Sequence, residues 1–345
     1  MDDLLVVYAS FGEGHRVAAF SLKEHFGCLC KDLLDFCSPL VKKIYRFSYL
    51  FVTDYFPFLW KITFFFTYKK SLINFINKFH FFLFSRFLEY LKKSKPKVIF
   101  LTHFFPIFLS SSLKEKLKFK LMVIVTDTRV HPLWVDKYVD NYFVVSEEAK
   151  KDLVELGIEE KKIISGFFSF RKGFIREFSK EELRRKFSLP YKESILFVSS
   201  LIRGKIPFLK EVLPHLLNRF NIFIIYGKNK KLKKYLEKFK SPSLKYFSFY
   251  EKMWEIMSLT FLIVTKPGGL TLFEGIYKKN YFVFPLYIPG QEEKNLRWAI
   301  KGKIARRIKS GKEILEAIDY FLKKKNQPYP LIIRNIYKIL EEKIK

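Results

Sequence analysis

Residues 265–274 read Thr-Lys-Pro-Gly-Gly-Leu-Thr-Leu-Phe-Glu and join an apolar run over residues 261–265 to a helical pattern over residues 271–277. Two glycines permit a tight turn and let a ligand approach the backbone closely. The helix that follows offers free N–H groups and the positive end of its dipole, which together form an anion site suited to a diphosphate. A simple turn between strand and helix is the alternative, because Lys-Pro-Gly-Gly by itself indicates only a turn.

The same alternation of strand and helix extends outward in both directions. In the second half, apolar runs predict strands at residues 195–199, 222–226, 244–247, 261–265 and 281–284, with helices over 208–219 and 230–240. In the first half, strands are predicted at 4–8, 98–102, 121–125 and 142–145, with helices over 16–26 and 147–156. Strands that are apolar throughout and alternate with helices indicate parallel sheets covered on both faces. We therefore predict an α/β fold of two doubly wound, Rossmann-like domains that face each other across a cleft.

The length of 345 residues suits two domains of ordinary size. We predict an N-terminal domain over residues 1–168, with an inserted segment at 44–90, and a C-terminal domain over residues 169–325. Residues 326–345 are predicted as a C-terminal helix, and whether this helix returns to the N-terminal domain is left open.

Composition excludes several classes of protein. A hydrophobic content of 49% excludes a disordered chain. Three cysteines within ten residues (Cys28, Cys30 and Cys37) argue against a disulfide-stapled secreted module and favour a cytoplasmic protein. The longest charge-free run, residues 98–113, is shorter than the roughly 18–20 apolar residues that span a bilayer. We expect a cytoplasmic protein that is soluble or peripheral to a membrane.

The chain carries 64 Lys and Arg against 34 Asp and Glu, a net charge of +30. A biased base composition or heat adaptation could explain much of this excess. The segment of residues 44–90 is more telling, because 19 of its 47 residues are aromatic and basic residues interrupt them. This pattern fits the membrane–water interface, where rings settle among headgroups and cations attract anionic lipids. The predicted membrane contacts are Trp60, Phe64, Phe65 and Phe66.

Two other interpretations of residues 44–90 stay open at this point. The segment could be a helical hairpin packed in the domain core, or its rings could stack on nucleic-acid bases. No RNP-type strand or helix-turn-helix signature supports the second alternative, and we expect no nucleic-acid partner.

Three further clusters of polar residues follow predicted strands. His15 lies on the first helical turn after Gly12 and Gly14, where an imidazole with an ordinary pKa of about 6.5 could serve as a general base or could be merely structural. Asp127 and His131 lie in residues 126–134, at the predicted cleft. Residues 285–295 follow the next strand after the glycine turn, so that Gln291 and Glu292 would face a ligand held there, and Glu274 could accept two ribose hydroxyls.

Taken together, these motifs resemble the family of diacylglycerol glycosyltransferases, which comprises monogalactosyldiacylglycerol synthases and processive diacylglycerol glucosyltransferases of the GT-B superfamily. The resemblance is carried by residues 10–19, 102–106, 126–134, 142–148, 266–274 and 289–295. It implies a GT-B architecture in which the C-terminal domain holds a nucleotide sugar and the N-terminal domain reaches an acceptor lipid. It also implies that the aromatic segment docks on the bilayer, on the inner face of the cell membrane.

The resemblance implies roles for particular residues. The nucleotide sugar would be bound by Gly268, Gly269, Leu270 and Thr271 at the diphosphate, Glu274 at the ribose, and Gln291 and Glu292 at the sugar hydroxyls. Gly12, Gly14, His131 and Trp134 would form the acceptor side. The chain departs from the family at residues 199–205, which lack the usual glycine-rich turn, and Arg203, Lys205 or Lys266 could neutralise phosphate there instead.

We therefore expect an inverting glycosyltransferase that moves a hexose from a UDP-sugar to a lipid acceptor, with diacylglycerol as the expected lipid and His15 or Asp127 as the base. No cofactor is expected, and no cluster with metal-ligand spacing calls for a metal. The alternatives are a soluble enzyme similar to UDP-N-acetylglucosamine 2-epimerase and a basic nucleic-acid-binding protein. The sequence does not decide the identity or number of the sugars, or the oligomeric state.

Overall fold

The computed structural model of the protein describes residues 3–199 and 204–344. The chain forms two compact units. The first comprises Met1–Lys172, Pro289–Gln291 and Ile333–Lys345, and the second comprises Gly173–Ile288 and Glu292–Ile332. The main division therefore follows residue 172, four residues after the boundary predicted from the sequence.

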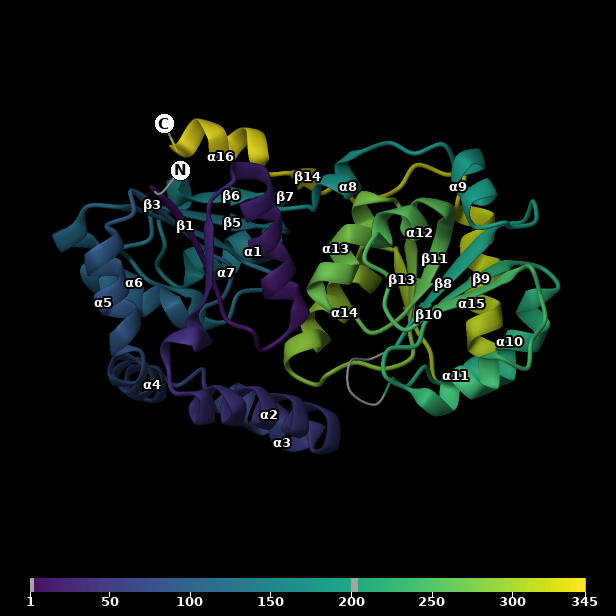
Figure 1. Cartoon of the computed structure of the whole chain (residues 1–345), viewed down its shortest axis with the longest axis horizontal. Helices are drawn as coiled ribbons and strands as arrows, with labels where there is room; N and C mark the ends of the chain where they lie inside the picture. Colours follow the sequence, from purple (N-terminus) through teal and green to yellow (C-terminus); the bar gives the residue numbers. More distant parts are fainter. Residues whose placement is uncertain (1–2, 200–203, 345) are drawn as a thin grey trace. The chain divides into compact units, whose positions relative to one another are not determined.

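The first unit contains a parallel six-stranded sheet in the order β2-β1-β3-β4-β5-β6. Its strands are β1 (Leu4–Tyr8), β2 (Leu29–Asp32), β3 (Val98–Leu101), β4 (Lys120–Ile124), β5 (Asn141–Val144) and β6 (Ile163–Ser165). Its principal helices are α1 (Glu13–Phe26), α5 (Ser85–Ser94), α6 (Phe105–Leu117) and α7 (Glu147–Glu155). The chain moves from β1 to β2 on one side and then returns to β3 on the other, so the sheet reverses direction between β1 and β3 (Figure 1).

The second unit repeats this plan with the order β10-β9-β8-β11-β12-β13. Its strands are β8 (Ser194–Val198), β9 (Asn221–Ile225), β10 (Leu244–Phe247), β11 (Thr260–Val264), β12 (Tyr281–Phe284) and β13 (Ala305–Arg307). Its helices are α9 (Lys180–Lys186), α10 (Leu209–Leu217), α11 (Lys230–Leu236), α12 (Met253–Leu259), α13 (Gly269–Tyr277), α14 (Gln291–Lys301) and α15 (Gly311–Lys324). Here the reversal lies between β8 and β11. The two parallel sheets confirm the predicted α/β class.

Burial of the strands explains why their sequences are apolar throughout. Val6 and Val7 in β1 and Ile99 and Phe100 in β3 are fully buried, with helices on both faces of the sheet. Burying one such side chain contributes roughly 1.5–3 kcal/mol. Because apolar residues face both sides, neither sheet shows the alternation that marks a half-exposed strand.

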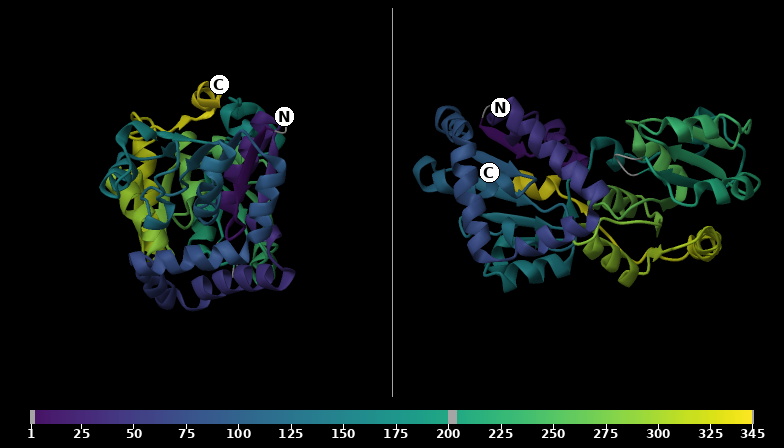
Figure 2. Two further views of the ribbon diagram at one scale, coloured as in Figure 1. Left: turned by 90° about the vertical axis from the view of Figure 1, so that its left-hand side faces the viewer. Right: turned by 90° about the horizontal axis from the view of Figure 1, so that it is seen from below.

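The inserted segment between β2 and β3 is helical. It contains α2 (Pro39–Tyr55), α3 (Pro57–Phe66) and α4 (Lys70–Leu83) before it reaches α5. Ser38 caps the start of α2 by accepting a hydrogen bond from the Val41 amide, and Pro39 and Pro57 each occupy the first turn of their helix, where no backbone donor is needed. Figures 1 and 2 show α2, α3 and α4 as a layer beside the first sheet.

Most of this layer is not core. Phe84, Phe87, Leu88 and Leu91 at its end are buried, so α5 packs as an ordinary core helix. In α2–α4 and the turns that join them, many large hydrophobic side chains are exposed instead: Ile44, Phe47, Phe51, Tyr55, Phe56, Phe58, Leu59, Ile62, Phe65, Phe66, Phe75, Phe79, Phe81 and Phe82. Packing in the domain core therefore accounts for the end of residues 44–90 and not for the rest. Within the described part of the chain, no helix is both long and apolar enough to cross a bilayer.

The C-terminal helix α16 (Tyr337–Ile344) belongs to the first unit. The short strand β14 (Arg334–Asn335) pairs with β7 (Phe167–Phe168) and leads the chain into it. Tyr337 donates a hydrogen bond of 3.0 Å to the Ser21 carbonyl and stacks on His25 at 3.8 Å between ring centroids. His25 also contacts Glu341 at 2.8 Å. These contacts fix α16 against α1.

Candidate active site

His15 lies at the reversal point of the first sheet, on the first turn of α1. Gly12 precedes the helix with no side-chain cap, and the space beside its Cα is open. The Nδ1 atom of His15 is 2.7 Å from the carbonyl oxygen of Thr102, which follows β3, and 3.1 Å from Oγ1 of Thr126, which follows β4. Thr102 also donates its hydroxyl to the His15 carbonyl at 2.9 Å. Three neighbouring strands thus position one imidazole.

These contacts fix the tautomer of His15. A backbone carbonyl can only accept a hydrogen bond, so Nδ1 carries the proton and Nε2 carries the lone pair. Among the described residues, no hydrogen bond reaches Nε2. Burial lowers the pKa of His15 to about 4, although the Thr102 carbonyl opposes that shift. The imidazole is therefore neutral near pH 7, with a proton-accepting atom available, and its side chain retains partial exposure.

Aromatic side chains form the surroundings of His15. Its ring lies 4.4 Å from that of His103 and 6.3 Å from that of Trp134, measured between centroids. His103 is buried, and its Nδ1 accepts a hydrogen bond of 3.1 Å from the Phe105 amide. Burial, with His15 and His80 nearby, holds the pKa of His103 well below its usual range. The side chains beside His15 thus form an uncharged and largely apolar wall.

His131, predicted on the acceptor side, connects this wall to the inserted helices. Its Nδ1 accepts a hydrogen bond of 3.1 Å from the Leu133 amide at the start of the turn that contains Trp134. Its Nε2 lies 3.0 Å from Oγ1 of Thr67, between α3 and α4, and that hydroxyl donates to the Phe64 carbonyl at 2.6 Å. The rings of Phe64 and Tyr68 pack on His131 at 4.9 and 4.3 Å. His131 is buried at this junction.

Asp127, the second candidate for the base, is partly buried in the loop after β4. This loop is held by Arg129, which donates to both oxygens of Asp152 at 2.7 and 2.5 Å. Asp152 also accepts from the Val130 amide at 2.8 Å. A bidentate pair of this kind gives geometric specificity as well as attraction. It fixes the backbone on which Thr126, Asp127 and His131 lie.

In the second unit, the predicted anion site is the start of α13. Gly268 is its N-cap, and no side chain caps the helix. The first-turn amides of an α-helix have no partner within the helix, so those of Gly269, Leu270 and Thr271 are suited to a ligand, and all three residues are partly exposed. A Cβ placed on Gly268 would lie 3.3 Å from Nζ of Lys266. The ammonium group therefore lies at the helix terminus, with Oε1 of Glu292 at 3.5 Å from the same point.

Residues 285–295, which lead from β12 into α14, are joined to this turn. Lys266 forms an ion pair with Oε1 of Glu292, whose side chain is only 5% exposed. Oε2 of Glu292 accepts from the Ile288 amide at 2.9 Å, and Asn295 donates to the Pro267 carbonyl at 3.1 Å. Glu292 and Lys266, predicted separately for sugar and phosphate, thus lie together beside Gly268.

The structure describes some, but not all, of the remaining predicted site residues. Glu274 is buried within α13. The side chain of Gln291 lies outside the described part of the structure, and so does Arg203. Of the four predicted membrane contacts, Phe65 and Phe66 are about half exposed, whereas Trp60 and Phe64 are partly buried. No three His, Cys, Asp or Glu side chains of the described residues are grouped closely enough to hold a metal ion.

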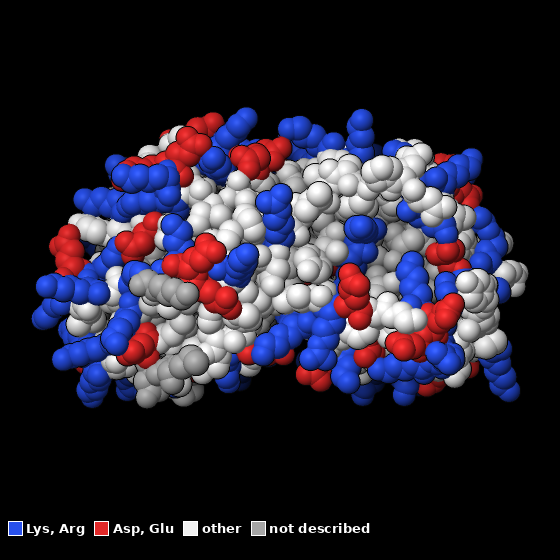
Figure 3. Space-filling view, turned by 90° about the horizontal axis from the view of Figure 1, so that it is seen from above, with Lys and Arg blue, Asp and Glu red and all other residues white. Residues whose placement is uncertain are grey.

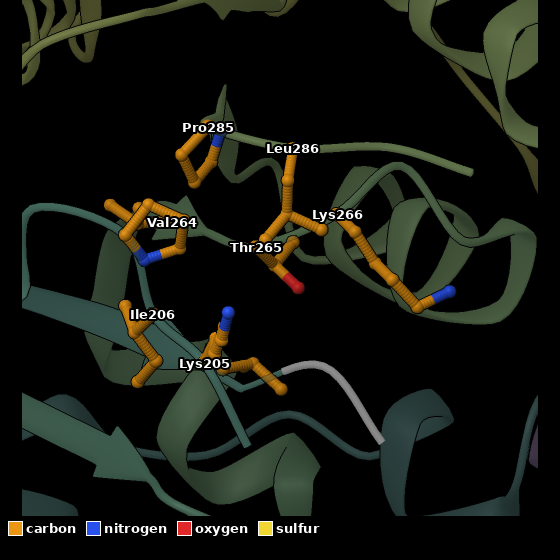
Figure 4. A pocket seen from close by; sticks show the side chains of 9 residues that line it. Lys205, Ile206, Val264, Thr265, Lys266, Pro285 and Leu286 are labelled. Atoms are coloured by element: carbon orange, nitrogen blue, oxygen red, sulfur yellow. The ribbon is translucent and has the colours of Figure 1, made fainter. Parts of the chain in front are cut away.

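A small pocket lies beside the anion site (Figure 4). It is lined by Val198, Lys205, Ile206, Pro207, Val264, Thr265, Lys266, Pro285 and Leu286. These residues follow or end β8, β11 and β12, so the pocket lies at the carboxyl ends of the strands and at the reversal point of the sheet, where doubly wound folds bind ligands. Lys205 extends into the pocket below Thr265. The space between these residues, about 190 Å³, includes open solvent.

The residues that orient His15 were not among the predicted site residues. Thr102, His103 and Thr126 come directly after β3 and β4, the two strands that follow β1 across the sheet. The sequence offered a signal for these residues, because the predicted strands end at residues 102 and 125. Combined with the strand order, they would have placed all three side chains near His15.

The chain is similar in sequence to known proteins. A family model described as monogalactosyldiacylglycerol (MGDG) synthase matches residues 15–166. The processive diacylglycerol beta-glucosyltransferase of Bacillus cytotoxicus is 26% identical over 91% of this chain and 84% of its own length, and that of Bacillus cereus strain B4264 is 25% identical over 92% and 85%. The chain is thus similar to the diacylglycerol glycosyltransferase family over most of its length. The resemblance predicted from the sequence is thereby confirmed.

Solved structures support the fold of this glycosyltransferase. UDP-GlcNAc 2-epimerase from Neisseria meningitidis, solved with UDP-GlcNAc bound, aligns with a TM-score of 0.57 at 15% identity and covers 98% of both chains. MurG of Acinetobacter baumannii aligns with a TM-score of 0.56 at 13% identity over 99% of this chain and 98% of its own. The predicted GT-B class is confirmed. At these identities the likeness concerns the fold alone, so the epimerase structures do not favour epimerase activity in this glycosyltransferase.

Proposed function

We propose that this enzyme transfers a hexose from a UDP-sugar to diacylglycerol with inversion at the anomeric carbon, at a membrane surface. The observation that carries this proposal is the locked tautomer of His15, whose Nδ1 donates to Thr102 while Nε2 stays available at the carboxyl edge of the first sheet. A neutral imidazole in that state can accept a proton from an alcohol. The names of the family relatives, which act on diacylglycerol, support the choice of acceptor.

The donor site is assigned to the carboxyl edge of the second sheet. The uncapped start of α13 supplies backbone donors, and Lys266 supplies a cation beside them. A diphosphate is the part of a nucleotide sugar that such a site recognises. The epimerase of similar fold, solved with UDP-GlcNAc, supports a UDP-sugar as the donor.

The proposed reaction is a direct displacement. Nε2 of His15 accepts the proton of the diacylglycerol hydroxyl while its oxygen forms a bond to the anomeric carbon. The bond from that carbon to the diphosphate oxygen breaks, and its electron pair stays on UDP. The departing diphosphate gains negative charge, which the α13 amides and Lys266 are preorganised to stabilise.

Membrane contact is assigned to the exposed side chains of α2–α4. Phe58, Phe75 and Phe82 are 72%, 66% and 82% exposed, and lysines lie between these rings along the sequence. Large apolar side chains with interspersed cations bind the boundary between headgroups and acyl chains. On the face drawn in Figure 3, by contrast, Lys and Arg are interspersed with Asp and Glu and form no single basic tract.

The direct test is a panel of UDP-glucose, UDP-galactose and UDP-N-acetylglucosamine incubated with vesicles that contain diacylglycerol. The proposal expects a diacylglycerol product heavier by one sugar, with the β configuration at its anomeric carbon by NMR when the donor is an α-linked UDP-sugar. Mass spectrometry separates single from repeated addition. An altered UDP-sugar without glycolipid, or a product of retained configuration, would contradict the proposal.

A further inference from the structure

The second unit carries an unusually dense group of lysines on and around α11. Seven of the 13 residues at 228–240 are lysine, whereas Lys and Arg together make up about one in five residues of the whole chain. All seven side chains are exposed: Lys228, Lys230, Lys231, Lys233, Lys234, Lys238 and Lys240. We call this group the α11 lysine cluster. Within residues 228–240 the one acidic residue is Glu237, which forms an ion pair with Lys233 at 3.5 Å.

The scaffold of the cluster is well packed. Leu232 and Leu236 are buried on the inner face of α11, and Asn229 caps its start by accepting from the Leu232 amide at 2.9 Å. Tyr235 donates to the Lys210 carbonyl at the start of α10 at 3.0 Å, and Nζ of Lys210 lies 5.3 Å from the Tyr235 ring, so Lys210 adjoins the cluster (Figure 1). The lysines are therefore held outward by a fixed helix.

The position of the cluster is the second observation. α11 follows β9, so it begins at the carboxyl edge of the second sheet, the edge that carries the pocket and the start of α13. Asn229 donates to the Gly204 carbonyl at 3.0 Å, and the next residue, Lys205, lines the pocket. One continuous set of contacts thus connects the lysine cluster to the pocket.

We propose that the α11 lysine cluster is a second membrane contact, which binds the anionic headgroups of the bilayer by electrostatic attraction. The inference rests on the proposed function, because a lipid acceptor requires the edge that holds the donor sugar to approach the bilayer. Clusters of four to eight basic residues bind anionic lipid surfaces, with a contribution that adds up over the lysines. The cluster has no exposed large hydrophobic side chain. It would therefore bind headgroups by charge without inserting into the bilayer, in contrast to α2–α4.

The test uses the full chain and vesicles of phosphatidylcholine with 0 or 30% phosphatidylglycerol, measured by flotation at fixed salt. The variant K230Q/K231Q/K234Q removes three charges that have no ion pair among the described residues. A matched control, K279Q/K303Q/K323Q, removes three exposed lysines near the amino ends of β12 and β13. We expect at least a tenfold loss of affinity for the anionic vesicles in the first variant, little change in the control, and recovery in K230R/K231R/K234R.

Several results would overturn the inference. These are unchanged vesicle affinity in the first variant, an equal loss in the control, and a loss of affinity for single-stranded RNA with vesicle binding intact. Sugar transfer to detergent-dispersed diacylglycerol distinguishes failure of the lysine inference from failure of the proposed function. If transfer persists in the variant while vesicle binding is unchanged, the lysine inference fails alone, and if the wild type transfers no sugar, the proposed function fails.

Discussion

The two sheets carry the same topology but present opposite chemistry at their carboxyl edges. At the first edge, His15 is neutral, held by Thr102 and Thr126, and lies beside aromatic rings. At the second edge, Lys266 and Lys205 lie beside the uncapped start of α13. Under the proposed function, one architecture serves two tasks: burial keeps the imidazole of His15 uncharged as a base, while backbone donors and lysines at the other edge suit an anion.

The largest expected effect is a loss of transfer activity on substitution of His15, at the first edge, with UDP binding at the second edge unchanged. His15→Gln removes the proton acceptor and should lower kcat about 10³-fold, since a positioned general base contributes roughly 10²–10⁴-fold. The affinity for UDP, measured by calorimetry, should stay nearly unchanged because UDP is assigned to the other edge. His215→Gln, at an exposed position on α10, is the matched control.

Asp127→Asn should be measured in the same assay, because Asp127 is the second candidate for the base. If it abolishes transfer while His15→Gln retains a tenth or more of the wild-type rate, the base is Asp127 and the comparison between the edges is wrong in that respect. Loss of both transfer and UDP binding in His15→Gln would also count against the assigned role.

The second prediction concerns the ion pair of the cationic edge. Lys266→Met leaves the Glu292 carboxylate buried without its cation and should lower the free energy of unfolding by about 3 kcal/mol, the lower end for a broken buried pair. UDP affinity should fall about tenfold or more. The double variant K266M/E292Q should recover stability in denaturant unfolding without recovering UDP affinity. Full recovery of both would show that Lys266 has only a structural role.

The third prediction tests the exposed rings of the first unit. Replacing Phe58, Phe75 and Phe82 with serine should weaken vesicle binding about tenfold or more, because each ring loses apolar area that it would bury at the interface. The control replaces Tyr191 and Phe249, which are equally exposed in the second unit, with serine. Flotation with neutral vesicles is the measurement, and equal losses in both variants would refute the assignment to α2–α4.

A smaller effect should follow at the residue that orients the base. Thr126→Val removes the hydroxyl 3.1 Å from Nδ1 of His15 and should lower kcat about tenfold, with a smaller change in KM. Thr126→Ser should restore most of the rate, and Thr63→Val, at an exposed position on α3, is the control. A change confined to thermal stability would mean that Thr126 is only part of the packing.

The smallest effect is in the pH dependence of stability. Burial lowers the pKa of both His15 and His80 to about 4, whereas an unfolded chain binds these protons near pH 6.5. Stability is therefore lost as the pH falls from about 6.5 to 4, by roughly 1–3 kcal/mol for each histidine. His80→Gln should reduce the slope in denaturant unfolding over this range. An unchanged slope would mean that His80 is not buried as described.

The fold was predictable because the chemistry that specifies it is local. Residues 4–8 and 281–284 are apolar runs preceded by polar residues, and these strands begin and end as predicted. Of the four edge strands of the six-stranded sheets, β10 was predicted and β2, β6 and β13 were not. β2 and β13 are short and polar: β2 reads Leu-Cys-Lys-Asp and β13 reads Ala-Arg-Arg. Strands at or near an edge bury less, so their sequences lose the apolar signal.

Part of the candidate site was predictable because its sequence signals are also local. The positions of His15 and Gly268 follow from a strand, a turn and a helix that are contiguous in the sequence. The carbonyl of Thr102 as the partner of Nδ1, and the ion pair between Lys266 and Glu292, depend on how separate loops meet and have no local signature.

The central claim is that a diphosphate binds the start of α13 while His15 at the other edge acts as the base. The most direct measurement is an experimental structure with UDP bound. We expect phosphate oxygens about 2.7–3.2 Å from the amide nitrogens of residues 269–271, with Lys266 turned toward them. A diphosphate bound elsewhere, with the α13 amides covered by protein atoms, would contradict the account.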